Sequence, residues 1–415
     1  MSRKLVSFEE AQRAIGYHFK PADLGIEHSV LLEAYNRVLA EDIVSSLNIP
    51  PFNRSTMDGY AVRAADTAGA DENRAITLSV VGAINVGEQP TFKLGKGETA
   101  EIVTGAVLPE GADAVVMVED TQREDSQLEA YVQVSDGENV LGAGADIKKG
   151  SVVLRKGQLL GAPEIGVLAA LGITVVNVQR IPVVAVLSTG SEVTELGKTL
   201  SPGRIYDTNG HSLCTAVMES GAKAVYMGVV PDDKAALTRK LQVALDSADM
   251  VVTSGGVSVG PKDYTPEVVD SLGKPGVVIN GIAVKPGKPT TVGFVEEKPV
   301  FSLPGHPSAA LLMFYLLARP LVQRLAGRPV TPMKSVPAIA GSRMFSAKGR
   351  RNFVMVRLEF DENCRLIAEP VEGGASGAIT TLAGADGFVE VAENEQYIDA
   401  EQEVSVKLFR STPNV

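Results

Sequence analysis

A glycine- and serine-rich segment follows an apolar run of the strand type in the middle of the chain. Ser254-Gly255-Gly256-Val257-Ser258 comes after Met250–Thr253, and Asp263 follows shortly afterwards. Glycine lets backbone N–H groups approach an anion closely, and Ser254 and Ser258 add hydroxyl donors. The segment therefore indicates a phosphate-binding loop with a carboxylate nearby for Mg²⁺. A tight turn that uses glycine for positive φ would explain the same residues, so both interpretations stay open.

Carboxylates follow two other strand-like runs. Glu192 ends the segment Ser188-Thr189-Gly190-Ser191-Glu192, which follows Val183–Leu187, and Asp232-Asp233 follows Ala224–Val230. Because Mg²⁺ in proteins usually takes few carboxylates and keeps several waters, Glu192, Asp232 and Asp263 could share one ion. Each loop also has a structural explanation. One of the paired aspartates at 232–233 could cap a helix, and Glu192 could be a solvated residue in an ordinary turn.

Basic residues and a helix start follow later runs. Lys285-Pro286-Gly287-Lys288-Pro289 places two cations on a stiff turn, and Leu303-Pro304-Gly305-His306-Pro307 opens a helix. Lysines bind oxyanions as point charges, and the free N–H groups of a helix start attract anions. Each segment alone is explained by an exposed turn or a plain helix entry. Together these loops indicate a nucleotide or phosphorylated ligand with Mg²⁺.

The elements that must position these loops alternate between strand and helix patterns over residues 179–328. Val183–Leu187, Ala224–Val230 and Met250–Thr253 read as buried strands, and Asn209 and Asp232 or Asp233 can cap the helices between them. This alternation predicts a parallel α/β sheet, whose ligands bind beyond the carboxyl ends of the strands. A long helix from about Pro307 to Leu325, kinked at Pro320, closes the segment.

The remaining segments have other patterns. Ser7 and Glu10 form a capping box for a first helix, Ser29–Ala40 reads as a second, and Pro163–Leu171 reads as a third. Short strands dominate residues 51–140 and 329–415. We predict four parts: an elongated mixed part of residues 1–50 with 141–178 that forms the dimer contact, a β-rich insert at 51–140, an α/β part at 179–328 and a small β part at 329–415.

Composition narrows the classes of function. The 415 residues carry a net charge of -11, which argues against nucleic-acid binding. The two cysteines, Cys214 and Cys364, suggest neither a disulfide framework nor a zinc site, and the four histidines (His18, His28, His211 and His306) show no ligand spacing. No signal peptide or membrane span is predicted, so we expect a cytoplasmic protein.

An ordered series of motifs covers nearly the whole chain. The series resembles the molybdopterin molybdotransferase family, which includes the C-terminal part of gephyrin-type proteins. Its members here are Met57-Asp58-Gly59-Tyr60-Ala61-Val62, Ile102-Val103-Thr104-Gly105-Ala106, Ser188-Thr189-Gly190, Ile205-Tyr206-Asp207-Thr208-Asn209, Ser254-Gly255-Gly256-Val257-Ser258, Lys285-Pro286-Gly287-Lys288-Pro289 and Leu303-Pro304-Gly305.

The resemblance implies a multidomain α/β fold, with a three-layer α/β/α molybdopterin-binding domain, a β-rich insert and a C-terminal β-barrel. It implies a transferase that inserts molybdate into adenylylated molybdopterin with Mg²⁺-dependent release of AMP. It also implies a homodimer with a shared site, and a molybdopterin adenylyltransferase as the upstream donor.

The resemblance also implies roles for individual residues. Asp58 and Thr104 would reach over the other subunit's site, and Glu192, Asp232 and Asp263 would handle Mg²⁺ and the pyrophosphate. The residues expected to hold molybdate are Ser258, Lys285, Lys288, Arg350 and Ser376. Asp207 and Asn209 would lie near the nucleotide, with Ser254, Gly255, Gly256, Pro304 and Gly305 in the substrate-binding loops.

The sequence departs from the family pattern at three places. Residues 139–146 lack the arginines that are common there, Gly281 replaces a basic residue, and Ser191 replaces an aspartate. Three other functions stay open: a molybdopterin adenylyltransferase, a non-catalytic scaffold and a tungstate-inserting variant. The flanking domains argue against an adenylyltransferase. The retained Asp58, Lys285 and Arg350 argue against a non-catalytic scaffold.

Overall fold

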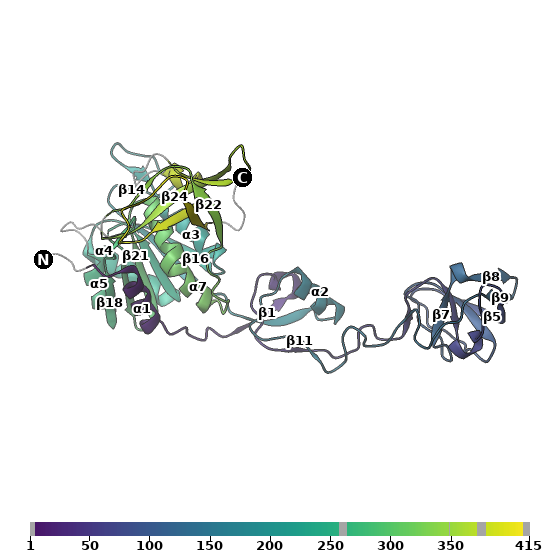
Figure 1. Ribbon diagram of the computed structural model, residues 1–415. Coiled ribbons are helices and arrows are strands. Elements are labelled where there is room, and N and C mark those ends of the chain that lie inside the picture. The colour runs from purple at the N-terminus through teal and green to yellow at the C-terminus, as the bar shows by residue number, and fades with distance from the viewer. Residues whose placement is uncertain (1–4, 257–263, 348, 372–378, 410–415) are drawn as a thin grey trace. The chain divides into compact units, whose positions relative to one another are not determined.

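The computed structural model describes residues 5–256, 264–347, 349–371 and 379–409 (Figure 1). The chain divides into two compact units. Unit 1 comprises residues 1–27, 36–38 and 179–415, and unit 2 comprises residues 28–35 and 39–178. The finer division into four parts stays a prediction. None of the helices in the described ranges is long and apolar enough to cross a membrane.

A six-stranded sheet in the order β16-β13-β17-β21-β20-β18 forms the centre of unit 1. β13 is parallel to β16 and β17, and β17 is parallel to β21. Because β20 is antiparallel to both β21 and β18, β18 runs in the common direction and only β20 is reversed. The strands are β13 (Val183–Thr189), β16 (Lys223–Val230), β17 (Met250–Ser254), β18 (Pro275–Asn280), β20 (Thr291–Val295) and β21 (Lys298–Leu303).

Helices cover both faces of this sheet. Alternate residues of β13 point to opposite faces: Val184 and Val186 pack in the cluster with the first set of helices, Ala185 and Leu187 in the cluster with the second. The first set is α1 (Phe8–His18), α3 (Asn209–Glu219), α6 (Pro307–Met313), η4 (Phe314–Ala318) and α7 (Arg319–Leu325); the second is α4 (Lys234–Ser247) and α5 (Thr265–Leu272). The predicted three-layer α/β/α fold is therefore confirmed.

Local sequence signals account for several helix ends. Ser7 and Glu10 form the predicted capping box of α1, and the Asp233 side chain accepts a hydrogen bond from the Ala236 N–H at the start of α4. The long C-terminal helix of the α/β part is broken by the π-helical turn η4, which ends just before Arg319 and Pro320. A proline cannot donate to the preceding turn, which agrees with a break at this point.

A closed β-barrel completes unit 1. β24, β25, β22, β28 and β26 pair in this order, and an additional β24–β26 pairing closes the ring around an apolar core. β19 pairs with β24 in parallel and so joins the α/β part to the barrel. The elements are β19 (Val284–Lys285), β22 (Ser335–Ala340), β23 (Met344–Phe345), β24 (Arg351–Phe360), β25 (Leu366–Pro370), α8 (Ile379–Ala383), β26 (Gly387–Val391), β27 (Tyr397–Ile398) and β28 (Glu403–Leu408), with β14 (Val193–Thr194) and β15 (Ile205–Tyr206) in the α/β part.

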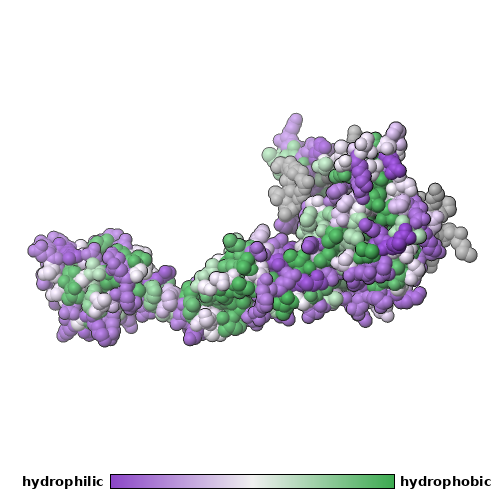
Figure 2. All heavy atoms as spheres, turned by 180° about the vertical axis from the view of Figure 1, so that it is seen from behind, coloured by the Kyte–Doolittle hydropathy of each residue, from purple (hydrophilic) through white to green (hydrophobic). Residues whose placement is uncertain are grey.

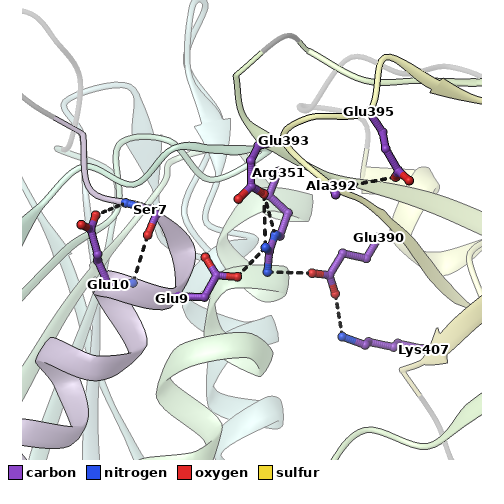
Figure 3. A network of polar contacts seen from close by, with 9 residues as sticks. All are labelled: Ser7, Glu9, Glu10, Arg351, Glu390, Ala392, Glu393, Glu395 and Lys407. Atoms are coloured by element: carbon purple, nitrogen blue, oxygen red, sulfur yellow. Dashed lines mark hydrogen bonds and ion pairs between the residues drawn. The ribbon is translucent and has the colours of Figure 1, made fainter.

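A charge network ties the barrel to the first helix (Figure 3). Arg351 on β24 pairs with Glu9 of α1, with Glu390 at 3.0 Å and with Glu393 at 3.2 Å. Lys407 on β28 pairs with Glu390 at 2.6 Å. One guanidinium thus connects the N-terminal helix with two segments of the C-terminal barrel.

Unit 2 contains the predicted β-rich insert. Its sheet has the order β7-β4-β6-β5-β9-β8, and two apolar clusters pack against it. The strands are β4 (Gly59–Val62), β5 (Ile76–Ile84), β6 (Glu98–Ile102), β7 (Ala114–Met117), β8 (Thr121–Glu124) and β9 (Gln127–Ala130), with the 3-10 turns η2 (Ala64–Thr67) and η3 (Val118–Asp120).

The rest of unit 2 corrects one prediction. Ser29–Ala40 is not a helix: it contains the end of β1 (Ile26–Val30), which pairs with β12 (Val175–Gln179), and the short 3-10 turn η1 (Leu31–Ala34). Strand pairing therefore overrides the local helical pattern. The other elements are β2 (Ile43–Val44), β3 (Arg54–Ser55), β10 (Val140–Leu141), β11 (Val152–Leu154) and the predicted third helix, α2 (Ala162–Ala170).

Candidate functional site

A buried carboxylate organises the start of α3. Asp207 is only 3% exposed and accepts hydrogen bonds from Ser188 Oγ (2.7 Å), Tyr226 Oη (2.7 Å) and the Gly210 N–H (2.9 Å). Ser188 and Tyr226 lie on the paired strands β13 and β16, so Asp207 fixes α3 to the sheet. Burial, followed by the hydrogen bond to Asp207, raises the pKa of Tyr226 well above its usual range, so the hydroxyl stays protonated and donates. The sequence gives no signal for Tyr226, because only strand pairing brings it to Asp207.

Asn209 connects three loops at the carboxyl edge of the sheet. Its Nδ2 donates to Ser254 Oγ at 2.6 Å and to the Gly305 carbonyl at 2.7 Å, and Ser254 Oγ donates to the Pro304 carbonyl at 3.1 Å. The prediction that Asn209 caps α3 is wrong, because Thr208 occupies the cap position and Asn209 points to these loops. Asn209 is 8% exposed, and its Oδ1 has no hydrogen-bond partner in the part of the chain that the structure describes.

The glycine-rich loop after β17 begins in close contact with β13. The Gly255 N–H donates to the Leu303 carbonyl at 3.2 Å, and a Cβ on Gly255 would lie 2.2 Å from the Thr189 carbonyl oxygen. With φ at +87°, only glycine fits this position without strain. Gly256 continues the loop, whereas the predicted Ser258 and Asp263 lie outside the described residues. The start of the predicted anion loop thus faces the Ser188–Gly190 segment.

The two described carboxylates of the predicted magnesium site lie on neighbouring loops. Asp232 Oδ2 accepts from the Ser191 N–H at 3.1 Å, and the Asp232 N–H donates to Ser191 Oγ at 3.4 Å. The exposed Glu192 folds its carboxylate over Gly190, within 2.8 Å of where a Cβ would be. Over residues 5–256, 264–347, 349–371 and 379–409, no group of three or more His, Cys, Asp or Glu side chains could hold a metal ion. The predicted magnesium site also needs Asp263, which lies outside the described residues, so the site stays a prediction.

A cavity of about 390 Å³ lies between the α/β part and the barrel, both within unit 1. Four basic side chains line it: Lys285, Lys288, Arg350 and His306, beside Pro304. The remaining described lining is mainly proline, aliphatic and phenylalanine, and it includes no aspartate or glutamate. Three of the residues predicted to hold molybdate therefore share one cavity, and Ser376 lies outside the described residues. His306 lies in the predicted loop at 303–307, but the sequence gives no separate signal for it.

Backbone pairing holds the cations in place. β19 contributes Lys285 and pairs with β24 directly after Arg350, while the Arg351 N–H donates to the Ala283 carbonyl at 3.0 Å. The Arg350 N–H donates to the Ala347 carbonyl at 3.1 Å. Among the described residues, Lys285, Lys288 and Arg350 form no ion pair with a carboxylate. Three unpaired cations in a cavity of an acidic protein are suited to an oxyanion.

Asp58 and Thr104 form a local pair in unit 2. Asp58 Oδ1 accepts from the Thr104 N–H at 2.6 Å and from Thr104 Oγ1 at 2.9 Å. The backbone hydrogen bond from Thr104, and then the one from its hydroxyl, lower the pKa of Asp58, so this exposed carboxylate stays charged. The two residues predicted to act together are therefore neighbours, and their role in catalysis stays a prediction.

One of two departures from the family pattern has a structural explanation. Gly281 has φ at +98°, so a basic residue would be strained at this turn, and its Cβ would come within 2.8 Å of the Leu5 side chain. In residues 139–146, β10 pairs with β3, and Asn139 at φ +58° donates to the Val115 carbonyl. Both segments serve backbone packing here, and the structure gives no account of the missing arginines.

Fold and site together define a multidomain ligand-binding protein, with an open α/β sheet whose loops and adjoining barrel enclose a cationic cavity. Family models match three successive segments: the MoeA N-terminal region (domain I and II) over residues 6–172, a probable molybdopterin binding domain over 185–324 and the MoeA C-terminal region (domain IV) over 337–409.

Known proteins resemble the chain over nearly its full length. A molybdopterin molybdenumtransferase of Haemophilus influenzae is 36% identical over 92% of this chain and 94% of its own, and one of Bacillus subtilis is 32% identical over 98% and 95%. The crystal structure of a molybdopterin biosynthesis MoeA protein from Pyrococcus horikosii matches with a TM-score of 0.87 and 43% identity, covering 99% of this chain and 100% of that one. The chain belongs to the molybdopterin molybdenumtransferase family, and it is a transferase.

Proposed function

We propose that the protein inserts molybdate into adenylylated molybdopterin and releases AMP in a Mg²⁺-dependent step. The observation that carries the proposal is the cavity with Lys285, Lys288 and Arg350, whose cations have no carboxylate partner in the described part of the chain. Molybdate is a compact dianion, and unpaired cations with apolar walls would bind it without first breaking an ion pair.

The loops next to this cavity fit the organic part of the substrate. Pro304 lines the cavity, and its carbonyl accepts from Ser254, which is bound to Asn209. The buried Asn209 Oδ1 lacks a partner among the described residues and could accept an N–H of the pterin or the base. The substrate would therefore extend from the Ser254 and Asn209 loops toward the cations, where molybdate exchanges two oxygen ligands for the dithiolene sulfurs.

Glu192 and Asp232 provide the carboxylate oxygens that Mg²⁺ prefers, and both lie at the same edge of the sheet. We propose that they hold the ion together with Asp263. A bound Mg²⁺ would polarise the pyrophosphate that links the pterin to AMP. Water would then cleave the phosphoric anhydride and release AMP, while Asp232 keeps its position through its two hydrogen bonds with Ser191.

The first experiment measures AMP release from adenylylated molybdopterin, with and without molybdate and Mg²⁺. We expect release to require both and to accompany the formation of active cofactor. The substrate itself requires a molybdopterin adenylyltransferase as donor. If the protein binds the substrate but does not release AMP, under conditions in which a relative is active, the proposal is contradicted and a non-catalytic scaffold is favoured.

A cavity variant tests the proposed place of the anion. Lys288→Gln removes one cation, so we expect molybdate binding to weaken about tenfold, as the Coulomb energy of a unit charge near a dianion implies. The melting temperature should stay the same, because Lys288 forms no ion pair with the described residues. Lys234→Gln, which breaks a surface pair with Glu267, is the matched control and should leave binding unchanged. If wild type and Lys288→Gln bind molybdate equally, the proposal that molybdate binds in this cavity is wrong.

We further propose a homodimer whose contact includes an apolar surface of unit 2. Leu32 is 83% exposed and Tyr35 65%, and Val30, Val44 and Val175 are also exposed. Figure 2 shows extensive hydrophobic surface on the part that carries β1, β11 and α2. Such a surface commonly marks an interface. Sedimentation should show a dimer that Leu32→Asp shifts to a monomer; a monomeric wild type at high concentration would refute this.

A further inference from the structure

The barrel side of the cationic cavity carries an exposed aromatic ring. Phe345 of β23 lines the cavity and is 67% exposed, so its ring lies at the cavity mouth. In the pairing of β23 with β27, Met344 lies opposite Ile398, and both are buried in the barrel core. The adjacent pair, Phe345 and Tyr397, therefore points outward. Among the described residues, no other aromatic ring packs against Phe345. An exposed ring at a cavity mouth is suited to stacking against a flat ligand.

A buried amide fixes the backbone of Phe345 and adds a hydrogen-bond acceptor to the same cavity. Asn352 of β24 lines the cavity, is only 6% exposed, and donates from its Nδ2 to the Phe345 carbonyl oxygen at 2.7 Å. Because a carbonyl oxygen can only accept, the amide nitrogen faces it, and Oδ1 is left for another partner. Among the described residues, Oδ1 has no hydrogen-bond partner. This acceptor is therefore available to a molecule in the cavity.

Two kinds of polar group in this cavity suit different parts of a ligand. Lys285, Lys288 and Arg350 only donate hydrogen bonds, which suits the oxygens of molybdate. Asn352 Oδ1 only accepts, so it repels an oxyanion and is suited to an N–H group. A pterin is a flat ring system with N–H groups along its edge. It therefore offers the face that Phe345 can stack on and the donor that Asn352 can accept.

We propose that Phe345 and Asn352 bind the pterin ring of adenylylated molybdopterin, with the ring stacked on Phe345 and one of its N–H groups donating to Asn352 Oδ1. This inference rests on the proposed function, because it assumes that the cavity takes this substrate. The pyrophosphate joins AMP to the pterin part, which also carries the dithiolene. With the pyrophosphate at Glu192 and Asp232 and the dithiolene at the cations, the pterin lies against the barrel wall of the cavity.

The test measures binding of adenylylated molybdopterin to the full chain without molybdate, so that the substrate is not consumed. Phe345→Leu removes the ring but keeps apolar volume, and it should weaken this binding about five- to tenfold, as loss of one stacked aromatic contact implies. Its binding of molybdate alone should equal that of wild type, and Phe345→Tyr should restore substrate binding. Asn352→Ala should also weaken substrate binding. Phe360→Leu, at a 63% exposed phenylalanine of β24 outside the cavity lining, is the matched control and should bind as wild type.

A fluorescent variant distinguishes the pterin from the base. Because the chain contains no tryptophan, Phe345→Trp places a single reporter at the cavity mouth. Adenylylated molybdopterin should quench its emission and AMP should not, whereas Phe360→Trp should respond to neither. Quenching by AMP would assign this position to the base and overturn the proposal.

The remaining outcomes separate the two proposals. If wild type binds the substrate and Phe345→Leu binds it equally well, the pterin site is wrong, while the proposed function stands. If Phe345→Leu weakens molybdate binding as strongly as substrate binding, the ring acts on the anion site and the pterin assignment is again wrong. If wild type does not bind adenylylated molybdopterin at all, the proposed function itself is wrong.

Discussion

Asp207 is a buried carboxylate that is stabilised by neutral donors. Among the described residues its partners are two hydroxyls and one backbone N–H, and no cation pairs with it. Hydrogen bonds to a charged group are stronger than those between neutral groups, so each donor matters for the fold of this edge. Because Asn209 follows two residues later, the same network also positions the Asn209 amide at the Ser254 loop.

Tyr226→Phe tests this network. Loss of a hydroxyl donor to a buried carboxylate should lower the free energy of unfolding by about 1–3 kcal/mol. Since the folded protein raises the pKa of Tyr226, its contribution is complete below the ordinary tyrosine value of about 10 and declines as the pH rises above it. Urea unfolding at about pH 8 and above pH 10 should show this decline in wild type but not in Tyr226→Phe.

Tyr206→Phe is the matched control for this measurement. Its hydroxyl donates to the Lys198 carbonyl at 3.2 Å on the surface, so its loss should cost less than about 0.5 kcal/mol. A Tyr226→Phe protein as stable as this control would show that the Asp207 network adds little.

At the scale of residues, the sequence predicts which side chains belong to the site more readily than it predicts which side chains contact one another. The basic turn at 285–289 predicts two anion-binding lysines, the family resemblance adds Arg350, and the three residues share one cavity. Tyr226 could not be predicted, since it contacts Asp207 only through the pairing of β13 and β16. Asn209 was read as a cap because asparagine is common there, and its actual partners lie on distant loops.

At the scale of elements, α1 connects to the barrel through charge as well as through apolar contact. Its buried Phe8 packs edge-on against Phe353 of β24, with ring centroids 5.6 Å apart. Arg351, the neighbour of Asn352 and Phe353 on that strand, pairs with Glu9, Glu390 and Glu393 (Figure 3). The helix is thus held by its capping box at one end and by β24 along its side.

Arg351→Gln should destabilise unit 1 because Glu9 and Glu393 lose the cation that pairs with them, whereas Glu390 keeps its ion pair with Lys407. Breaking a well-buried network costs about 3–5 kcal/mol, and the partial exposure of these carboxylates reduces the expected loss to about 1–3 kcal/mol. Urea unfolding at low and high salt should show a loss that salt diminishes. Arg343→Gln, which breaks an exposed pair with Asp399, should change stability by less than about 1 kcal/mol. Equal losses in both variants would refute the bridging role.

Periodicity and caps predicted the elements of unit 1 well and one segment of unit 2 poorly. The apolar runs at 183–187 and 250–253 became buried strands because they are covered on both faces. The segment 29–40 carries apolar residues at helical spacing; Ala34, Val38 and Leu39 are buried, whereas Leu32 and Tyr35 face solvent. The exposure of Leu32 and Tyr35 suits contact with another molecule.

At the scale of the whole molecule, unit 2 is an insertion within unit 1. The Arg180 N–H donates to the Gly25 carbonyl at 3.0 Å, so the two ends of unit 1 that flank the insertion lie side by side. Residues 36–38 also belong to unit 1, where the Arg37 guanidinium pairs with Glu27 at 2.5 Å. Unit 1 therefore has its own core and closely spaced ends.

A variant that replaces residues 28–178 by a short glycine-serine linker should fold. We expect a single cooperative urea transition, with stability below that of the full chain because the contacts of residues 36–38 are lost. It should still bind molybdate but should not release AMP, because Asp58 and Thr104 are absent. An unfolded product, or full turnover, would contradict this prediction; residues 28–178 expressed alone provide the control for unit 2.

The same insertion sets an order for biosynthesis. The ribosome makes α1 first, but β18 and β24, on which α1 packs, are translated only after all of unit 2. Unit 2 can therefore fold before β18 and β24 are available to cover the apolar face of α1, which is formed by Phe8, Ala11 and Ile15. Contacts between distant parts of a chain form slowly, so the nascent protein passes through a stage in which unit 2 is folded while the apolar face of α1 is still exposed. Chaperones that bind apolar helices would meet this protein at α1, during translation rather than after it.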